Sequence, residues 1–303
     1  MKRILHYEIN PEDDGRTVHE FLTSRGYSHA VFVQLKKTSY GILVNHNWYY
    51  VTDRLHTGDQ LVITLEETES STQIKPVPMP LAIVYEDEDL LVVNKPSDMP
   101  VHPSMNHYDH TLANGVMHYF TSQGIPYTFR CVNRLDRDTT GLTLLAKNML
   151  SSAILSRQIL HREIHRTYLA IAEGKVPDFG TVNAPIARKS GSTIERTVDF
   201  ADGERAVTHY RRIAFQNGLS LLALQLETGR THQIRVHMNY IGHPLIGDFL
   251  YYPESTLLPR QALHSFCLAF AHPITGVQTS YTAPLPADMR AFFPSLSEEE
   301  LFF

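Results

Sequence analysis

Apolar residues along this chain occur mainly in short runs bounded by turn residues, a pattern that predicts strands. Two such runs, 81–85 and 90–96, lie on either side of an acidic turn and predict a hairpin. Two further runs, 207–215 and 219–226, are separated by an Asn-Gly pair, which is a strong signal for a tight hairpin turn. Because hairpins join antiparallel neighbours, we expect a largely antiparallel sheet.

Other segments show the spacing of three and four residues that is typical of helices. Ile234, Met238 and Ile241 fall on one helical face that ends before a glycine. Asn148 can cap a helix that could run as far as His165, followed by a strand at 166–172. Strands and helices in this order predict an α+β fold with a mixed, largely antiparallel central sheet and flanking helices. A doubly wound nucleotide-binding fold is disfavoured, because no glycine-rich phosphate loop follows a strand.

The composition of residues 69–80 predicts a linker. Acidic and hydroxyl residues give way there to three prolines, which favour an extended chain. We therefore predict a small α+β domain at 1–68, a linker at 69–80 and a larger domain at 81–303. The first of these has a helix start near residue 17 and an alternating strand at 58–65.

Composition places the chain among globular proteins, and its charge is unevenly distributed. Of its 303 residues 43% are hydrophobic, yet no apolar stretch approaches the roughly 18 residues of a membrane span. The start lacks the apolar region of a signal peptide, and two distant cysteines suit a cytoplasmic protein better than a disulfide scaffold. The formal net charge is −5, but residues 130–240 hold 16 Lys and Arg against 10 Asp and Glu. Positive charge is thus concentrated where a phosphate backbone could dock.

Residues 133–142, Asn-Arg-Leu-Asp-Arg-Asp-Thr-Thr-Gly-Leu, are the most informative segment. Asp136 lies between Arg134 and Arg137, and adjacent positive charge would keep such an acid ionised at a loop-to-strand junction. On spacing alone, the pattern favours an aspartate that simply ends a loop.

A second segment, 226–238, contains a dense set of donors after a glycine. It carries Arg230, Thr231, His232, Gln233 and Arg235 at a predicted strand-to-helix transition, where side chains and amides can converge on an anion. The spacing of its two histidines is wrong for a metal site on one helical face. In the predicted strand 166–172, Tyr168 is either a site residue or an ordinary core tyrosine.

These segments together resemble the RluA-type family of RNA pseudouridine synthases. The first is similar to the family's His-Arg-Leu-Asp-x-x-Thr-Ser/Thr-Gly, with Asn133 in place of histidine. The second is similar to Thr-Gly-Arg-x-His-Gln-Ile/Leu-Arg-x-His, and Arg166-Thr-Tyr168 is similar to Lys-x-Tyr. Residues 94–103 resemble the family's Asn-Lys-Pro…Val-His-Pro run. Residues 260–264 and 271–276 resemble its C-terminal part.

The resemblance implies an enzyme that converts uridine in structured RNA to pseudouridine with a catalytic aspartate. It implies Asp136, Tyr168 and Arg235 as catalytic residues, Arg235 being the partner of Asp136 with Arg230 as the runner-up. It also implies a set of substrate-binding residues: Lys95, Asn133, Arg134, Arg230, Thr231, His232 and Gln233. The reaction imports no group, so we expect neither a cofactor nor a metal.

Partners and alternatives complete the set of expectations. Large-subunit ribosomal RNA is the expected substrate, with tRNA as the alternative, in a monomeric protein that contacts no membrane. The N-terminal domain resembles an S4 RNA-binding domain, although only Lys36 and Lys37 supply its basic face. A ribosome-assembly factor that has lost activity, and a carboxylate-dependent hydrolase, remain as other classes. A hydrolase would require a second acid or a metal cluster. His161 and His165 would share a helical face, and we interpret them as surface residues, since their surroundings lack the zinc pattern.

Overall fold

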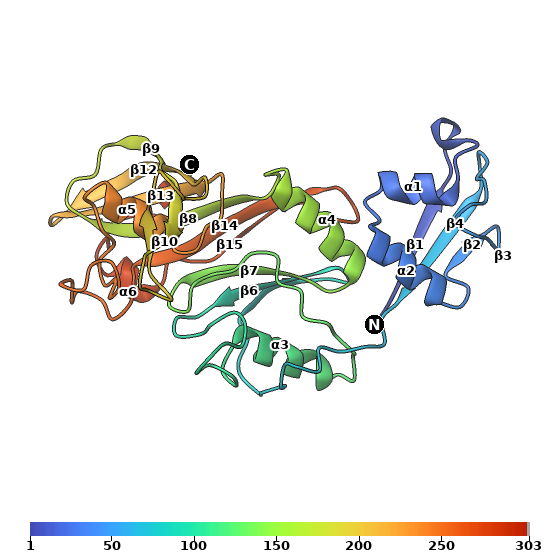
Figure 1. The fold of residues 1–303 in the computed structure, drawn as a ribbon, viewed down its shortest axis with the longest axis horizontal. Coiled ribbons are helices and arrows are strands. Elements are labelled where there is room, and N and C mark those ends of the chain that lie inside the picture. Colours follow the sequence, from blue (N-terminus) through green and yellow to red (C-terminus); the bar gives the residue numbers. More distant parts are fainter. Residues whose placement is uncertain (302–303) are drawn as a thin grey trace.

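The computed structural model describes residues 1–301 and contains two main sheets (Figure 1). The N-terminal unit has a four-stranded antiparallel sheet in the order β1-β4-β2-β3. Its elements are β1 (Lys2–Glu8), a 3-10 turn (Pro11–Asp13), α1 (Val18–Ser24), α2 (His29–Lys37), β2 (Ile42–Val44), β3 (Asn47–Trp48) and β4 (Gln60–Glu66).

The expected helix near residue 17 and the expected alternating strand are both present in this unit. Thr17 caps α1 because its side chain accepts a hydrogen bond from the Glu20 amide, and the Glu20 carboxylate in turn accepts one from the Thr17 amide. Leu61, Ile63 and Leu65 of β4 are buried against the two helices, as their alternation predicts.

The larger unit is built on a nine-stranded sheet in the order β5-β6-β7-β14-β8-β13-β12-β9, with β15 also paired to β14. All of its neighbours are antiparallel except β7 and β14, so the expectation of a mixed, largely antiparallel sheet is confirmed. The strands of this sheet are β5 (Ile83–Glu86), β6 (Leu90–Lys95), β7 (Thr140–Ala146), β8 (His165–Glu173), β9 (Phe179–Asn183), β12 (Val207–Gln216), β13 (Leu219–Leu226), β14 (Leu263–Ala271) and β15 (Gln278–Thr282). The remaining elements are α3 (Leu112–Thr121), α4 (Met149–Leu160), the hairpin β10 (Ile186–Arg188) and β11 (Arg196–Val198), α5 (Gln233–Tyr240), α6 (Ala287–Arg290) and a final turn (Glu299–Leu301).

Both predicted hairpins form. β5 pairs with β6, and β12 pairs with β13 across Asn217 and Gly218. The φ angles of these two turn residues are 53° and 78°, as a tight turn with two left-handed residues requires. Turn chemistry therefore sets the register of the β12–β13 pair.

The prediction that the helix after Asn148 reaches His165 is wrong, because α4 ends at Leu160 and His165 begins β8. Arg162 adopts a left-handed conformation with φ 61°, and the Glu163 amide bonds back to the Gln158 carbonyl. This arrangement closes the helix in the way that a glycine usually does. His161 and His165 therefore do not share a helical face, although both are exposed as expected.

The N-terminal unit is fastened to the larger one along α4 (Figure 1). Leu150 and Ile154 of α4 belong to the apolar core of the N-terminal unit. The guanidinium of Arg3 makes two hydrogen bonds to the buried Asp89 carboxylate, at 3.1 and 2.9 Å. The segment 69–80 is also bound to the larger unit, for example where the Ser71 amide donates to the Tyr127 carbonyl. Among residues 1–301, no helix has the length and apolar character that crossing a membrane requires.

Candidate active site

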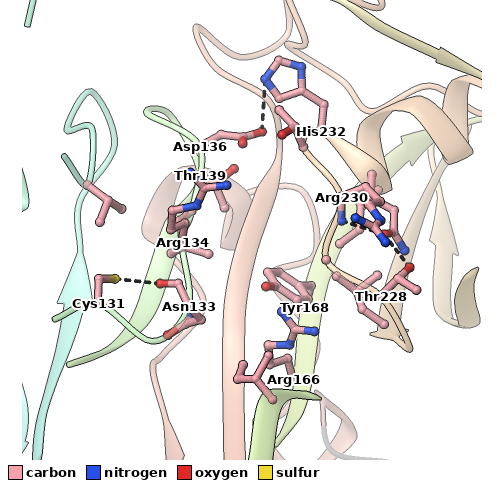
Figure 2. Close-up of a pocket in the computed structure, with 18 of the residues that line it drawn as sticks. Cys131, Asn133, Arg134, Asp136, Thr139, Arg166, Tyr168, Thr228, Arg230 and His232 are labelled. Carbon is pink, nitrogen blue, oxygen red and sulfur yellow. Dashed lines mark hydrogen bonds and ion pairs between the residues drawn. The ribbon is translucent and has the colours of Figure 1, made fainter. Parts of the chain in front are cut away.

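The main cavity of the larger unit is a cleft of about 840 Å³ between two loops. The loop before β7 forms one wall, the loop between β13 and α5 forms the other, and Tyr168 of β8 lies between them (Figure 2). Nearly all residues expected at the site line this cleft: Asn133, Arg134, Asp136, Tyr168, Arg230, Thr231, His232, Gln233 and Arg235. The fold therefore brings together motifs that are about 100 residues apart in the chain.

Asp136 is held by Arg235 at the mouth of the cleft. Arg235 Nη1 donates to Asp136 Oδ2 at 3.0 Å, and its Nε and Nη2 bind the buried carboxylate of Asp248 at 2.7 and 2.8 Å. The Asp136 side chain is 26% exposed, and within the described part of the chain its Oδ1 atom has no partner. One carboxylate oxygen is thus fixed and the other faces the cleft.

The charge of Arg235 is secured by its two acids. Burial alone would lower the pKa of this guanidinium, but hydrogen bonds and charge from Asp248 and Asp136 outweigh it and raise the pKa. The Arg235 guanidinium also lies 5.0 Å from the centroid of the Tyr251 ring. Arg235 is therefore a fixed cation, and it is the partner of Asp136 that the resemblance implied; Arg230 is not.

His232 is the second group near the Asp136 carboxylate. Its Nε2 lies 3.9 Å from Asp136 Oδ2, and its Nδ1 lies 2.9 Å from the Tyr251 hydroxyl. That hydroxyl accepts a hydrogen bond from the Arg196 amide, and it can donate its own proton to Nδ1 when the imidazole is neutral and protonated on Nε2. Burial lowers the pKa of His232, which favours this neutral form.

Tyr168 contributes apolar surface to the cleft. Its side chain is 5% exposed, and its ring packs in the main apolar core while its edge lines the cavity. Burial raises the pKa of its hydroxyl, so the phenol is neutral near pH 7. The two interpretations of this tyrosine therefore both apply, since it is a core residue and a cleft residue at once.

Two residues expected to bind substrate hold the first loop in this structure. The Asn133 amide donates to the Leu142 carbonyl at 3.0 Å and accepts from the Leu144 amide at 2.7 Å, so its polar atoms are used by β7. Lys95 does not line the cleft, and this expectation needs correction. Its ammonium is fully buried and donates to the backbone carbonyls of Pro96 and Arg137. Arg137 follows Asp136 in the chain, so Lys95 stabilises the loop that carries the carboxylate. Burial lowers the pKa of Lys95 to about 7.

Gln233 holds the second loop in the same way. Its Oε1 accepts from the Arg230 amide at 3.0 Å, and its Nε2 donates to the Val207 carbonyl at 2.9 Å. The side chains of Arg230 and Thr231 remain exposed at the rim, where Arg230 pairs with Glu204. Gln233 therefore stabilises the loop, and Thr231 lines the cleft beside it.

The two arginines that flank Asp136 differ in their surroundings. Arg137 binds its neighbour Asp138 through Nε and Nη2 and does not line the cleft. Arg134 is exposed, lines the cleft, and makes no hydrogen bond or ion pair with the other residues between 1 and 301. Only Arg134 is placed to meet a ligand.

Asp248 and Tyr251 belong to the site but were not expected from the sequence. Both come from the segment after α5, in the run Gly-Asp-Phe-Leu-Tyr-Tyr. Asp248 also accepts hydrogen bonds from the Leu250 and Tyr251 amides, which fixes the turn. The Gly-Asp pair indicates a turn and nothing more, so no signal in the sequence pointed to either residue.

One cluster of metal-ligand type lies outside the cleft. Ligand atoms of Asp87, Asp89 and His272 approach within 4.8 Å of one another. Protein groups already occupy them, since Arg3 binds Asp89 and the His272 ring bonds to Asp87 at 2.9 Å. We assign this cluster to the junction with the N-terminal unit.

Known proteins are similar to this chain in both sequence and fold. Residues 89–240 match the family described as RNA pseudouridylate synthase. YjbO of Bacillus subtilis strain 168, an uncharacterized RNA pseudouridine synthase, is 41% identical over 274 residues, which cover 90% of this chain and 96% of that protein. The ribosomal large subunit pseudouridine synthase D of Escherichia coli K12 is 41% identical over 246 residues, or 77% and 75% of the two chains. The solved structure of human RNA pseudouridylate synthase domain containing 1 covers 68% of this chain and 83% of its own at 27% identity, with a TM-score of 0.57. The family match includes the segments of Asp136, Tyr168 and Arg235.

Proposed function

Because this chain belongs to the RluA-type RNA pseudouridine synthases, we propose that it isomerises specific uridines of large-subunit ribosomal RNA, with Asp136 as the catalytic carboxylate. The observation that carries the proposal is the half-held Asp136 carboxylate. Arg235 fixes Oδ2, Asp248 fixes Arg235, and Oδ1 is left facing the cleft. A positioned carboxylate with one oxygen available is what an attack at the target nucleotide requires.

The reaction requires the enzyme to open one bond and close another on the same nucleotide. The bond between N1 of uracil and C1′ of the ribose breaks, the base turns, and C5 joins C1′; C5 then loses its proton and N1 gains one. No atom is imported from a cofactor. In our assignment, Asp136 acts at the ribose or as a base, and Tyr168 lies against the detached uracil. The target must leave its base stack to reach the cleft, and Arg134 at the rim is placed to fill the space it leaves.

The choice of ribosomal RNA rests on relatives. Both the Escherichia coli and the Zymomonas mobilis relatives are ribosomal large subunit pseudouridine synthases D, at 41% and 43% identity. The basic segment 130–240, which supplies most of the cleft lining, suits a large structured RNA. Transfer RNA is the competing substrate in the test below.

The N-terminal unit enters the proposal as a second RNA contact. We propose that residues 1–68 act as an S4-like domain, with the exposed Lys36 and Lys37 at the end of α2 facing RNA. The Arg3–Asp89 pair would then hold this surface at a fixed angle to the cleft. Neutralising both lysines with glutamine should weaken RNA binding without altering the rate of the bound complex.

The decisive experiment compares the wild type with Asp136→Asn on transcripts of large-subunit ribosomal RNA and of tRNA. Asparagine keeps the size of the side chain but removes the carboxylate, so pseudouridine formation should fall by at least about 10³-fold. Sites of modification are then compared in RNA from cells with and without the gene. If the asparagine variant retained the wild-type rate, the assignment of Asp136 would be wrong. If only the tRNA transcript were modified, tRNA and not ribosomal RNA would be the substrate.

A further inference from the structure

Arg166 is a cation in the cleft that lacks an anion. It lies two residues before Tyr168 on β8, so the two side chains project from the same face of the strand, and both line the cleft (Figure 2). Across residues 1–301 its guanidinium makes no hydrogen bond or ion pair, and its Nε is buried without a partner. A buried donor without an acceptor is unusual in a folded protein.

Three other arginines of the cleft are paired with acids. Arg162 binds Glu227 at 3.0 Å, and Arg230 pairs with Glu204. Arg235 is bound by two carboxylates. The protein thus supplies an acid to most of the cleft arginines, while Arg166 and the rim residue Arg134 are left to an external partner.

The absence of a side chain at Gly229 leaves room for the Arg166 guanidinium. A Cβ atom at position 229 would lie 3.1 Å from Arg166 Nη1, closer than ordinary contact allows. The backbone of Gly229 is not left-handed, so its conformation does not require glycine. The absent side chain therefore matters chiefly as space beside Arg166.

We propose that Arg166 binds a phosphate of the RNA backbone next to the nucleotide that enters the cleft. The inference rests on the proposed function, because an RNA substrate provides phosphates as its anions. A planar guanidinium with several donors matches phosphate oxygens in two-point fashion. Its place beside Tyr168, where the target base would lie, puts the contact at the target or its immediate neighbour. Phosphate contacts of this kind set the position of the strand and carry no sequence information.

The test measures binding of the full-length chain to a large-subunit ribosomal RNA transcript at 50 to 200 mM KCl, apart from product formation. Arg166→Gln should weaken binding about 10-fold near 100 mM and reduce the slope of log Kd against log salt by about 0.7 to 0.9. Arg166→Lys should keep the wild-type slope and lose about 3-fold in affinity, because the charge remains but the fork is lost. Lys175→Gln is the matched control, since this exposed lysine follows the opposite end of β8 and should change neither value.

A second variant guards against misfolding of Arg166→Gln. Gly229→Ala displaces the guanidinium without touching its charge and should weaken binding about 2- to 3-fold with an unchanged slope. Wild-type affinity and slope in Arg166→Gln would overturn the phosphate contact. So would a change in rate without a change in binding, which would mean that Arg166 only supports Tyr168. A wild type that binds the transcript through Arg166 but forms no pseudouridine would instead overturn the proposed function.

Discussion

Each of the two walls of the cleft is stabilised by a buried side-chain amide, but the first wall has one more buried support than the second. In each wall a buried side-chain amide binds one backbone N–H and one backbone carbonyl: Asn133 does so for the loop before β7 and Gln233 for the loop before α5. The first loop has an additional buried support in Lys95, whereas the second carries exposed residues at its rim. The difference teaches that polar residues of a motif divide into those that hold a loop and those that face the substrate.

Replacing Arg235 should produce the largest effect, because this residue connects the two walls. Arg235→Met leaves the buried Asp248 carboxylate without its cation, and breaking such a pair costs about 3–5 kcal/mol of stability. It also releases Asp136, so kcat should fall by about 10²–10³-fold or more. Urea unfolding and single-turnover assays measure both quantities.

The pair of Arg137 and Asp138, in which the arginine side chain is 41% exposed, provides the control for that experiment. Arg137→Met breaks an arginine–carboxylate pair of comparable geometry at a partly exposed position, where we expect a loss of about 1 kcal/mol or less. Equal losses in the two variants would show that burial of the Arg235 pair is unimportant.

Lys95 should make stability depend on pH. The pKa of Lys95 falls from 10.5 to about 7 on folding, so between these values the unfolded chain binds the extra proton. Stability contributed through Lys95 therefore rises with pH above about 7, by up to about 1.4 kcal/mol per unit. Lys95→Met should flatten this rise in urea unfolding between pH 7 and 9, while Lys175→Met should follow the wild type. Parallel curves for wild type and Lys95→Met would contradict the burial argument.

Removing either amide should destabilise its own wall. Asn133→Ala leaves the Leu144 amide buried without a partner, and Gln233→Ala removes the side-chain acceptor of the Arg230 amide, at a cost of about 1–3 kcal/mol each. Both variants should lose catalytic rate, and the salt dependence of RNA binding should not change. A stable variant with weaker, less salt-dependent binding would show instead that the amide contacts RNA.

The smallest expected difference distinguishes the two arginines beside Asp136. Arg134→Gln removes an unpaired cation at the rim and should weaken RNA binding about 3- to 10-fold with a smaller salt slope. Arg137→Gln removes a cation already bound to Asp138 and should have little effect on binding. Identical binding losses would mean that the pairing of Arg137 does not persist in the complex.

The sequence predicts the local parts of this fold better than their assembly. Hairpins follow from turn chemistry, and the helix start at Thr17 follows from its capping residues. The end of α4 was misjudged because Arg162 takes the left-handed position that glycine usually occupies. Strand order across the sheet depends on contacts between distant segments, which periodicity does not report.

Most members of the candidate site were predicted from the sequence, but the part that Asn133 and Lys95 play in holding a loop was not. Short motifs bring Asp136, Tyr168 and Arg235 to one cleft, as expected. Asn133 carries both a donor and an acceptor, so its residue type suits a substrate contact as well as a backbone anchor. Burial of Lys95 is equally invisible in the sequence, because a lysine at the end of a strand is usually exposed.

The position of β14 has a consequence for how the enzyme is made. This strand lies between β7, which begins just after Asp136, and β8, which carries Tyr168. Its parallel pairing with β7 joins His264 and Ser265 to Thr140 and Gly141, more than 120 residues earlier. During synthesis the ribosome must therefore release residues up to about 271 before the spacing between carboxylate and tyrosine is set. A nascent chain that stops before residue 263 should bind RNA poorly and form no pseudouridine, which stalled ribosome complexes of defined length can measure.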